Sequence, residues 1–359
     1  MQTRSRRHVS RRQLTTSVAL AVLLSLVLAA CGSSSKSGAN TNGSTPSGSV
    51  TLRLGYFPNV THAPAIIGVQ NGTFATKLGS GVKLDLKTFN SGTEATTALL
   101  AGAIDASFVG PNPAINAYQK TKGDIRVVAG TASGGASLIV KPSINTAADL
   151  KGKKIGTPQA GNTQDVSLRT WLNKNGLHET KDGGDVTIVP EDNSVTLTAF
   201  QSGAIDGAWV PEPWATRLQT EGGGKVLVNE KSLWPGGKFA TTLLMVKKEF
   251  LDAHPDVVQN LITGLAGSID LIKSNPAQAK ELVGKGIEQV TGKPLKASII
   301  DASFKQLTFS LDPVASSLQT DAKNAEALGF LTSSDLANIF DFTLVNKVLQ
   351  ARGEPAISS

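Results

Sequence analysis

The sequence predicts an α/β protein of two similar lobes, in which helices flank parallel β-sheets and two strands cross between the lobes. Three observations lead to this prediction. Apolar runs typical of strands alternate with helical patterns, the arrangement expected of a parallel sheet covered by helices. The stretch "GAIDASFVGPNP" (102–113) recurs 101 residues later as "GAIDGAWVPEPW" (203–214), so each lobe contains the same helix end, strand and loop. Apolar runs at 137–142 and 241–248 flank the second copy and supply the crossing strands.

The first lobe is expected to contain four strands separated by helices. These strands are predicted at 51–57, 82–89, 104–110 and 125–130. Pro64 stands near the start of the first helix, where its missing N–H costs least, and Gly102 ends the helix that begins near residue 91. We expect Thr93 to be the N-cap of that helix.

The second lobe repeats this plan. Its strands are predicted at 153–158, 186–190 and 205–211, with helices at 162–176 and 194–203. Long helical patterns then run from residue 249 nearly to the end. The expected domain boundaries place 50–138 and 242–359 in the first lobe and 139–241 in the second, inserted lobe. The hinge is expected near 134–137 and 237–242, because a few loop or strand-end residues absorb domain closure.

The first 49 residues are expected to serve export and anchoring. Five arginines in the first twelve residues precede an uncharged apolar run at 18–30, which is too short for a membrane span and typical of a signal peptide. Cys31, the only cysteine in the chain, stands immediately after this run. "LAAC" resembles the bacterial lipobox, which implies removal of residues 1–30 and lipidation of Cys31, while "SRRQL" leaves a twin-arginine export route open. The Gly/Ser-rich stretch 31–49 is expected to be a flexible tether.

The net charge of +7 does not indicate a nucleic-acid partner. Without the five leader arginines, the chain has 30 basic and 28 acidic residues. The part of the chain after these arginines is therefore nearly neutral, and it lacks the basic surface that binds the phosphate backbone of nucleic acids. The four histidines are scattered along the chain, so we expect neither a metal site nor a cofactor.

Five segments taken together carry a family resemblance. They are "LGYFPNVTHAPAIIGVQNGTF", "ALLAGAIDASFVGPNPAI", "DLKGKKIGTPQAGNTQDVSLRTWLNKNGL", "FQSGAIDGAWVPEPWATRL" and "HPDVVQNLITGLAGSIDLIKSNPAQA". From about Thr51 to its end, the chain resembles substrate-binding proteins of bacterial ABC importers, in the nitrate/sulfonate/taurine group. The resemblance implies a type II periplasmic-binding-protein fold, a ligand cleft between the lobes and delivery of the solute to an ABC permease and its ATPase. The spacing of Asn59, His62 and Ala63 is shared with thiamine-precursor binders, so that ligand class stays open.

Loops of both lobes are expected to face the ligand. Ligands of open α/β sheets lie beyond the carboxyl ends of the strands, and helix N-termini there favour anions. The predicted ligand-binding residues are Asn59, His62, Ser91, Gly92, Thr93 and Asn112 in the first lobe, Gly134 and Gly135 at a crossing, and Gly161, Asn162, Thr163, Trp209, Pro211, Glu212 and Trp214 in the second lobe. A hinge role stays open for the crossing glycines, and a core role for either tryptophan.

Glu212 is unexpected in an anion site, because burying an unpaired carboxylate is costly. Three explanations stay open: Glu212 is solvated, it pairs with a protein cation, or the ligand carries a cationic part, as taurine or a protonated pyrimidine does. The predicted loops contain no lysine or arginine, which favours a monovalent, weakly hydrated anion such as a sulfonate or nitrate over phosphate. The leading expectation is an aliphatic sulfonate or taurine.

Two other classes of function stay open. Biosynthetic enzymes share this fold, but a cytoplasmic enzyme has no use for a lipoprotein leader, and the sequence shows no nucleophile motif. We therefore expect a binding protein without catalytic residues. A surface sensor would have the same sequence features. We expect a monomer on the outer face of the cytoplasmic membrane, anchored through Cys31, that binds a small anionic or zwitterionic solute.

Overall fold

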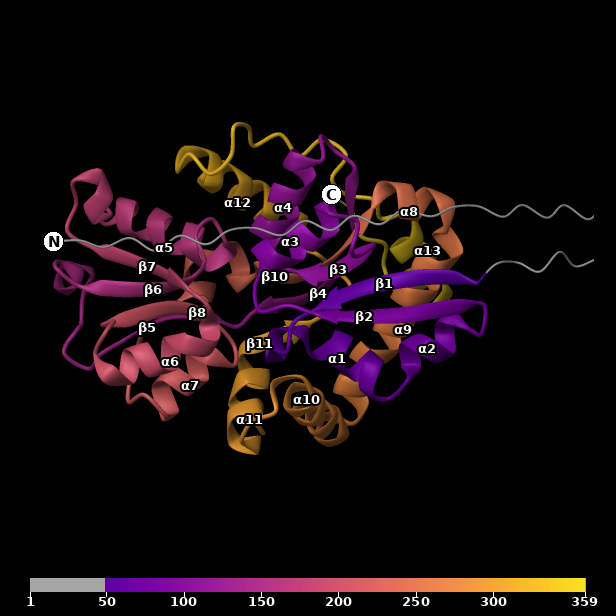
Figure 1. Cartoon of the computed structure of the whole chain (residues 1–359), viewed down its shortest axis with the longest axis horizontal. Coiled ribbons are helices and arrows are strands. Elements are labelled where there is room, and N and C mark those ends of the chain that lie inside the picture. Colours follow the sequence, from indigo (N-terminus) through magenta and orange to yellow (C-terminus); the bar gives the residue numbers. More distant parts are fainter. Residues whose placement is uncertain (1–48, 359) are drawn as a thin grey trace, which may run out of the picture. The chain divides into compact units, whose positions relative to one another are not determined.

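The computed structural model describes residues 49–358, which form two β-sheets with helices on both faces (Figure 1). The predicted signal peptide, Cys31 and the tether as far as residue 48 lie outside the described residues. The first sheet has six strands in the order β11 (Leu307–Phe309), β4 (Ile125–Gly134), β10 (Ala240–Lys247), β3 (Ala106–Val109), β1 (Val50–Tyr56) and β2 (Val82–Thr88). The second sheet has five strands in the order β7 (Thr187–Glu191), β6 (Lys154–Pro158), β8 (Gly207–Pro211), β5 (Ala136–Val140) and β9 (Lys225–Asn229).

Both sheets are mixed, whereas the sequence predicted parallel sheets. Strands β1, β2 and β3 are parallel, as are β6, β7 and β8. Strand β10 is antiparallel to both β3 and β4, and β5 is antiparallel to β8 and β9. The reason is the connection between the sheets: β4 runs toward the second sheet and β10 returns from it, so these neighbours must run in opposite directions.

The helices are distributed unevenly between the two sheets. Those that pack with the first sheet are α1 (Ala63–Gln70), α2 (Thr73–Leu78), α3 (Gly92–Leu100), α4 (Pro111–Lys120), α8 (Lys248–Ala253), α9 (Pro255–Ser274), α10 (Pro276–Thr291), α11 (Ala297–Gln306), α12 (Ala315–Ala327) and α13 (Thr343–Ala351). Those of the second sheet are α5 (Thr163–Lys174), α6 (Asn193–Ser202) and α7 (Trp214–Thr220). Short 3-10 helices are η1 (Val60–His62), η2 (Ala147–Leu150), η3 (Thr180–Asp182), η4 (Glu230–Leu233) and η5 (Pro235–Gly237). None of the helices within residues 49–358 is both long and apolar enough to cross a bilayer.

The chain crosses between the sheets at two places. The first crossing is the single residue Gly135, between β4 and β5. The second is the stretch 230–239, which contains η4 and η5. These changes of sheet lie beside the expected lobe boundaries at 138/139 and 241/242, which stay a prediction.

Glycine is required at the first crossing by both conformation and space. Gly134 and Gly135 have φ of 78° and 72°, in the left-handed region that side chains disfavour. A Cβ on Gly134 would lie 2.8 Å from the carbonyl oxygen of Gln306, and one on Gly135 would lie 2.4 Å from Cδ2 of Leu307. The crossing is therefore packed tightly against the segment that joins α11 to β11.

The repeated "GAID" segments occupy equivalent positions in the two sheets. The strand order β2-β1-β3-β10-β4 corresponds to β7-β6-β8-β5-β9. Oδ2 of Asp105 accepts a hydrogen bond from the backbone N–H of Arg53 at 2.9 Å, and Oδ2 of Asp206 accepts one from the N–H of Lys154 at 3.0 Å. Each repeat thus ties the start of its central strand to the adjacent parallel strand, and the halves correspond at an offset of 101 residues.

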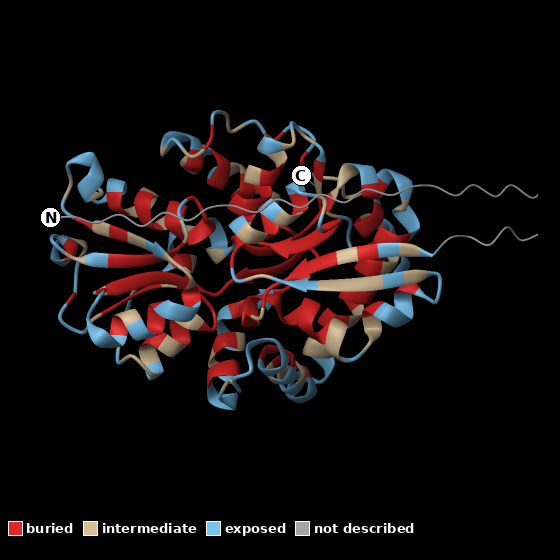
Figure 2. Ribbon diagram, viewed as in Figure 1, coloured by how far each residue is buried: buried red, intermediate tan, exposed pale blue. Residues whose placement is uncertain are grey.

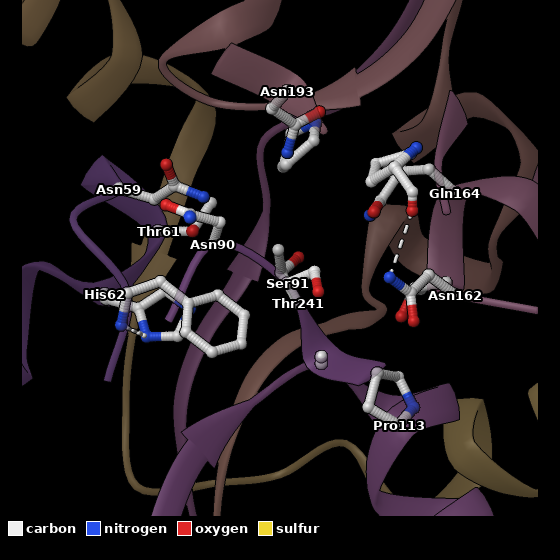
Figure 3. Close-up of a pocket in the computed structure, with 16 residues that line it drawn as sticks. Asn59, Thr61, His62, Asn90, Ser91, Pro113, Asn162, Gln164, Asn193 and Thr241 are labelled. Atoms are coloured by element: carbon white, nitrogen blue, oxygen red, sulfur yellow. Dashed lines mark hydrogen bonds between the residues drawn. The ribbon is translucent and has the colours of Figure 1, made fainter. Parts of the chain in front are cut away.

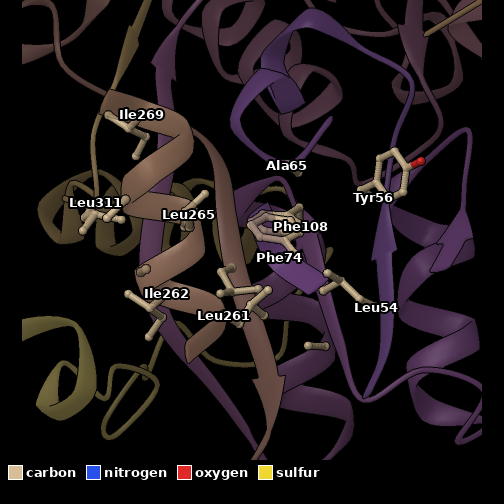
Figure 4. Close-up of a cluster of buried hydrophobic side chains, with 14 of the residues drawn as sticks. Leu54, Tyr56, Ala65, Phe74, Phe108, Leu261, Ile262, Leu265, Ile269 and Leu311 are labelled. Carbon is tan, nitrogen blue, oxygen red and sulfur yellow. The ribbon is translucent and has the colours of Figure 1, made fainter. Parts of the chain in front are cut away.

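The core beneath the first sheet fixes the loop that follows β1. Buried residues run along the strands of both sheets (Figure 2). Phe74 on α2 packs on Phe108 of β3, with ring centroids 6.2 Å apart (Figure 4). A Cβ on Gly68 of α1 would lie 2.4 Å from the Phe74 ring, and one on Gly264 of α9 would lie 2.9 Å from it. This close packing holds α1, and hence His62 just before it, in a fixed position.

Candidate functional site

A cavity of about 50 Å³ lies between loops of the two lobes, at the carboxyl ends of their strands (Figure 3). The lining residues are Phe57, Asn59, Thr61, His62, Asn90, Ser91, Gly92, Gly110 and Pro113 in the first lobe, Pro158, Asn162, Thr163, Gln164, Asn193 and Pro211 in the second, and Thr241 on β10. The cavity therefore has two walls, one from each lobe.

The internal repeat extends into this cavity. Five pairs of lining residues are each 101 positions apart: Phe57 and Pro158, Thr61 and Asn162, His62 and Thr163, Gly92 and Asn193, and Gly110 and Pro211. Equivalent loops of the two lobes therefore face one another across the cavity.

The structure brings about half of the sequence-predicted site residues to the cavity. Those that line it are Asn59, His62, Ser91, Gly92, Asn162, Thr163 and Pro211. Those that do not are Thr93, Asn112, Gly134, Gly135, Gly161, Trp209, Glu212 and Trp214. For the residues on the wall of the cavity, contact with a ligand stays a prediction.

His62 is a neutral hydrogen-bond donor in the cavity wall. Its ring is fully buried and stacks on Phe57 with centroids 4.4 Å apart. Burial lowers the pKa of His62 to about 3, so the imidazole is uncharged at neutral pH. The backbone N–H of Phe57 donates to Nδ1 at 3.3 Å, which places the proton of the neutral ring on Nε2.

Several helices begin at the cavity. Ser91 precedes α3, Gly110 precedes α4, Asn162 precedes α5, and α6 begins at Asn193, and all four residues line the cavity. Unpaired N–H groups at a helix start carry partial positive charge, so they attract an anion without a formal cation.

The N-cap of α3 is Ser91, and the prediction of Thr93 was wrong. The Ser91 hydroxyl accepts a hydrogen bond from the N–H of Glu94 at 3.4 Å, and Oε2 of Glu94 accepts one from the N–H of Asn90 at 2.9 Å. The arrangement resembles a capping box, whose Ser-x-x-Glu pattern is visible in the sequence, except that Glu94 accepts from the residue before the N-cap. Thr93 is exposed in the first turn of the helix.

Two hydrogen bonds connect the lobes beside the cavity. Thr93 Oγ1 donates to Oδ1 of Asn162 at 3.2 Å, and Trp214 Nε1 donates to Oδ1 of Asn59 at 3.1 Å. Thr93 and Trp214 are absent from the cavity wall, but each holds a residue that lines it. We call Thr93 and Trp214 rim residues, because each is bonded to a lining residue without lining the cavity itself.

Trp209 is a core residue. It is fully buried among the side chains between β8 and α5, and its Nε1 donates to Oε2 of Glu230 at 2.6 Å. Successive residues of a strand point to opposite faces. Trp209 therefore points away from its neighbours Ala208 and Val210, which pack against α6 and α7.

The surroundings of Glu212 match none of the three explanations given for it above. It is 2% exposed, so it is not solvated, and its carboxylate accepts hydrogen bonds from neutral donors. These are the Thr216 N–H at 3.1 Å, the Thr216 hydroxyl at 3.0 Å and the Ser303 hydroxyl at 3.1 Å. Burial raises the pKa of Glu212 despite these bonds. Because Ser303 belongs to α11, this carboxyl joins the lobes near the first crossing, and it gives no support for a cationic ligand.

The remaining predicted residues have other positions. The side-chain amide of Asn112 is buried on α4 without a hydrogen-bond partner among the described residues. Gly161 has φ of 73°, and its N–H donates to Oδ2 of Asp165 at 2.9 Å. Gly161 is thus part of the turn into α5, Gly134 is the last residue of β4, and Gly135 is the first crossing.

Nine lining residues were missed in the sequence. They are Phe57, Thr61, Asn90, Gly110, Pro113, Pro158, Gln164, Asn193 and Thr241. The 101-residue offset could have found three of them, because the predicted Asn162, Gly92 and Pro211 correspond to Thr61, Asn193 and Gly110. No comparable signal marks Thr241, which reaches the cavity from the strand that returns from the second lobe.

Comparisons with known proteins agree with this architecture. Over 197 residues the chain is 31% identical to the taurine-binding periplasmic protein of Escherichia coli strain K12, a match that covers 55% of this chain and 59% of that protein. It is 28% identical over 315 residues to the nitrate/nitrite binding protein NrtA of Synechococcus elongatus, covering 76% of this chain and 68% of that protein. The alkanesulfonate-binding protein SsuA of Xanthomonas axonopodis pv. citri, solved bound to MOPS, has a similar fold, with a TM-score of 0.68, 22% identity and coverage of 82% of this chain and 99% of that one.

The family assignment rests on a match to a family model over more than half of the chain. Residues 45–285, which include both copies of the repeat and all but the last helices, match the NMT1-like family. The chain therefore belongs to the NMT1-like family.

Proposed function

We propose that the protein is an extracytoplasmic solute-binding protein that captures an aliphatic sulfonate or taurine and delivers it to an ABC permease. The observation that carries this proposal is a cavity lined by neutral donors, on which helix starts from both lobes converge. The names of the relatives, a taurine binder and a nitrate/nitrite binder, support an anionic ligand.

The electrostatics of the cavity favour an ion of single charge. The described residues that line it include no lysine, arginine, aspartate or glutamate. Each helix start contributes roughly half a positive charge, which can balance one negative charge. A doubly charged sulfate or phosphate would lose more hydration on burial than these neutral groups restore. The wall also offers no carboxylate for the ammonium group of taurine, which favours an alkanesulfonate.

The anchoring and the partners are part of the same proposal. Cys31 carries the lipid after removal of residues 1–30, and the tether holds a monomeric binding protein at the outer face of the cytoplasmic membrane. Replacing Cys31 with serine is expected to move the protein from the membrane fraction to the soluble fraction. A variant that stays with the membrane would contradict the anchor without affecting the ligand assignment.

The ligand assignment is tested by titration calorimetry with methanesulfonate, taurine, nitrate, sulfate and phosphate. We expect the monovalent ions to bind and the doubly charged ions to bind far more weakly. A ligand at 100 times its Kd should stabilise the fold by about 2.7 kcal/mol in thermal unfolding. Comparable binding of sulfate or phosphate would contradict the neutral anion site.

A matched pair of variants locates the binding. Thr163→Val removes a hydroxyl from the cavity wall, and Thr97→Val removes one from the exposed face of α3. The first change is expected to weaken methanesulfonate binding by about 1.5–3 kcal/mol, the range for a hydrogen bond to a charged group, and the second to leave it unchanged. Equal affinity in both variants would place the ligand elsewhere.

A further inference from the structure

A second and larger hollow adjoins the cavity. This groove, called the tail groove here, has a volume of about 340 Å³ and is lined by Trp214 and Leu197 of the second lobe and by Leu295 of the first. Asn59, Asn90 and Asn193 line both hollows and form the neck between them. Figure 3 shows these three side chains in the wall of the cavity, with Asn59 and Asn90 next to one another.

The neck is polar, and the side-chain oxygen of one of its asparagines lacks a hydrogen-bond partner among the described residues. Asn193 is 6% exposed, and its Oδ1 has no hydrogen-bond partner among the described residues. Asn59 is 7% exposed, and its Oδ1 accepts the Trp214 hydrogen bond. A buried amide without a partner indicates a position where a ligand atom completes the hydrogen bonding.

Apolar side chains form much of the tail groove, and its charged lining residues are Arg217, Glu221, Lys293 and Lys296. Leu197 is buried, and the half-buried indole of Trp214 is held by Asn59 on one side and by the guanidinium of Arg217, 4.8 Å from its ring, on the other. Arg217 pairs with Glu221 at 2.8 Å, and Lys296 approaches the same carboxylate at 3.3 Å. The groove therefore offers a fixed aromatic surface and no unpaired carboxylate at Glu221.

We propose that the tail groove binds the organic tail of a sulfonate whose headgroup occupies the cavity. This inference rests on the proposed function and narrows it to sulfonates with tails of several carbons. The cavity of about 50 Å³ is large enough for a headgroup, whereas the groove of about 340 Å³ has room for an extended chain or ring. Because the two hollows share a neck of three residues, one molecule can occupy both.

The length of the alkyl tail of the sulfonate is the variable that tests the proposal. Calorimetric titration of the full chain with methane-, ethane-, butane-, hexane- and octanesulfonate should show affinity rising with length. Burying a methylene group contributes about 0.8 kcal/mol, so each carbon inside the groove is expected to raise affinity up to about fourfold. Affinity that is equal for methane- and hexanesulfonate would overturn the tail groove and leave the proposed function standing. Failure of every sulfonate to bind would overturn both.

Three variants separate the groove from the cavity. Trp214→Ala and Leu295→Ser each remove apolar wall from one lobe and are expected to lower hexanesulfonate affinity at least fivefold more than methanesulfonate affinity. Trp214→Phe keeps an aromatic wall but loses the bond to Asn59, so it should preserve most of the dependence on length. Trp171→Phe alters a tryptophan that packs on Trp209 away from both hollows and serves as the matched control. An unchanged dependence on length in both Trp214→Ala and Leu295→Ser would place the tail outside the groove.

Discussion

The two halves of the repeat place equivalent residues around the cavity but use their polar groups differently. In the first half, the Ser91 hydroxyl caps its own helix, and His62 Nδ1 accepts a hydrogen bond from its own loop. In the second half, Oδ1 of Asn162 is bonded to Thr93 of the opposite lobe, and Oδ1 of Asn193 has no partner among the described residues. Each wall is thus bonded to the opposite lobe, the first through Asn59 and the second through Asn162, but only the second wall has a buried amide oxygen without a partner among the described residues.

Acidification should produce the largest effect, and it acts on the first wall. The pKa of His62 is about 3 in the folded protein, below its usual value of 6.5. The unfolded chain therefore binds more protons between these values, so the stability contributed by neutral His62 is complete above pH 6.5 and is lost as pH falls toward 3. The loss is expected to reach up to about 1.4 kcal/mol per pH unit, measured by urea unfolding at pH 7.5, 6, 5 and 4.

The control for this prediction is His62→Gln, which cannot titrate. The variant should lose this part of the pH dependence, and the difference between the two proteins isolates His62 from the carboxyl groups. That separation matters because burial raises the pKa of Glu212 and Glu230, whose contribution to stability is lost as pH rises. Parallel pH curves for both proteins would show that His62 is not the titrating group.

Helix capping should give an intermediate effect and differ between equivalent positions. Ser91 and Asp192, which are 101 positions apart, precede α3 and α6, but only Ser91 makes a side-chain capping bond. Ser91→Ala is expected to lower the free energy of unfolding by about 1 kcal/mol, and Asp192→Ala by less. Urea midpoints at an unchanged m value measure both. Equal losses would remove the proposed difference between the two walls.

The bond between Thr93 and Asn162 should have the smallest effect. Thr93→Ala and Asn162→Ala remove the two ends of this link, so their effects on methanesulfonate affinity should be non-additive. A coupling of about 0.5 kcal/mol is expected, because Thr93 is exposed. The measurement is a double-mutant cycle by calorimetry, and strict additivity would show that the link does not support the binding-competent arrangement.

The large-scale features of the fold could be predicted because they depend on patterns that extend over many residues. The alternation of strands and helices gave the fold class, and the repeat at Gly102 and Gly203 identified two equivalent halves. The antiparallel strands β5 and β10 could not be predicted, because strand direction depends on how the chain crosses between the sheets.

The site was harder to predict because it depends on side-chain direction. Trp209 and Trp214 are five positions apart, yet one is in the core and the other at the rim. Glu212 was placed at the ligand because its partner Ser303 is 91 residues away in the sequence. Helix starts were the more reliable signal, since Ser91, Gly92, Asn162 and Thr163 all line the cavity.

The two rim hydrogen bonds also have a kinetic consequence. The Trp214–Asn59 and Thr93–Asn162 bonds each join one lobe to the other beside the cavity. We expect a bound ligand to escape when the lobes separate, so its dissociation rate should follow the frequency of that separation. Substitutions at the rim should then shorten the residence time of the ligand while leaving its association rate nearly constant. If the protein hands its ligand to a permease as proposed, the rim sets how long the ligand is held.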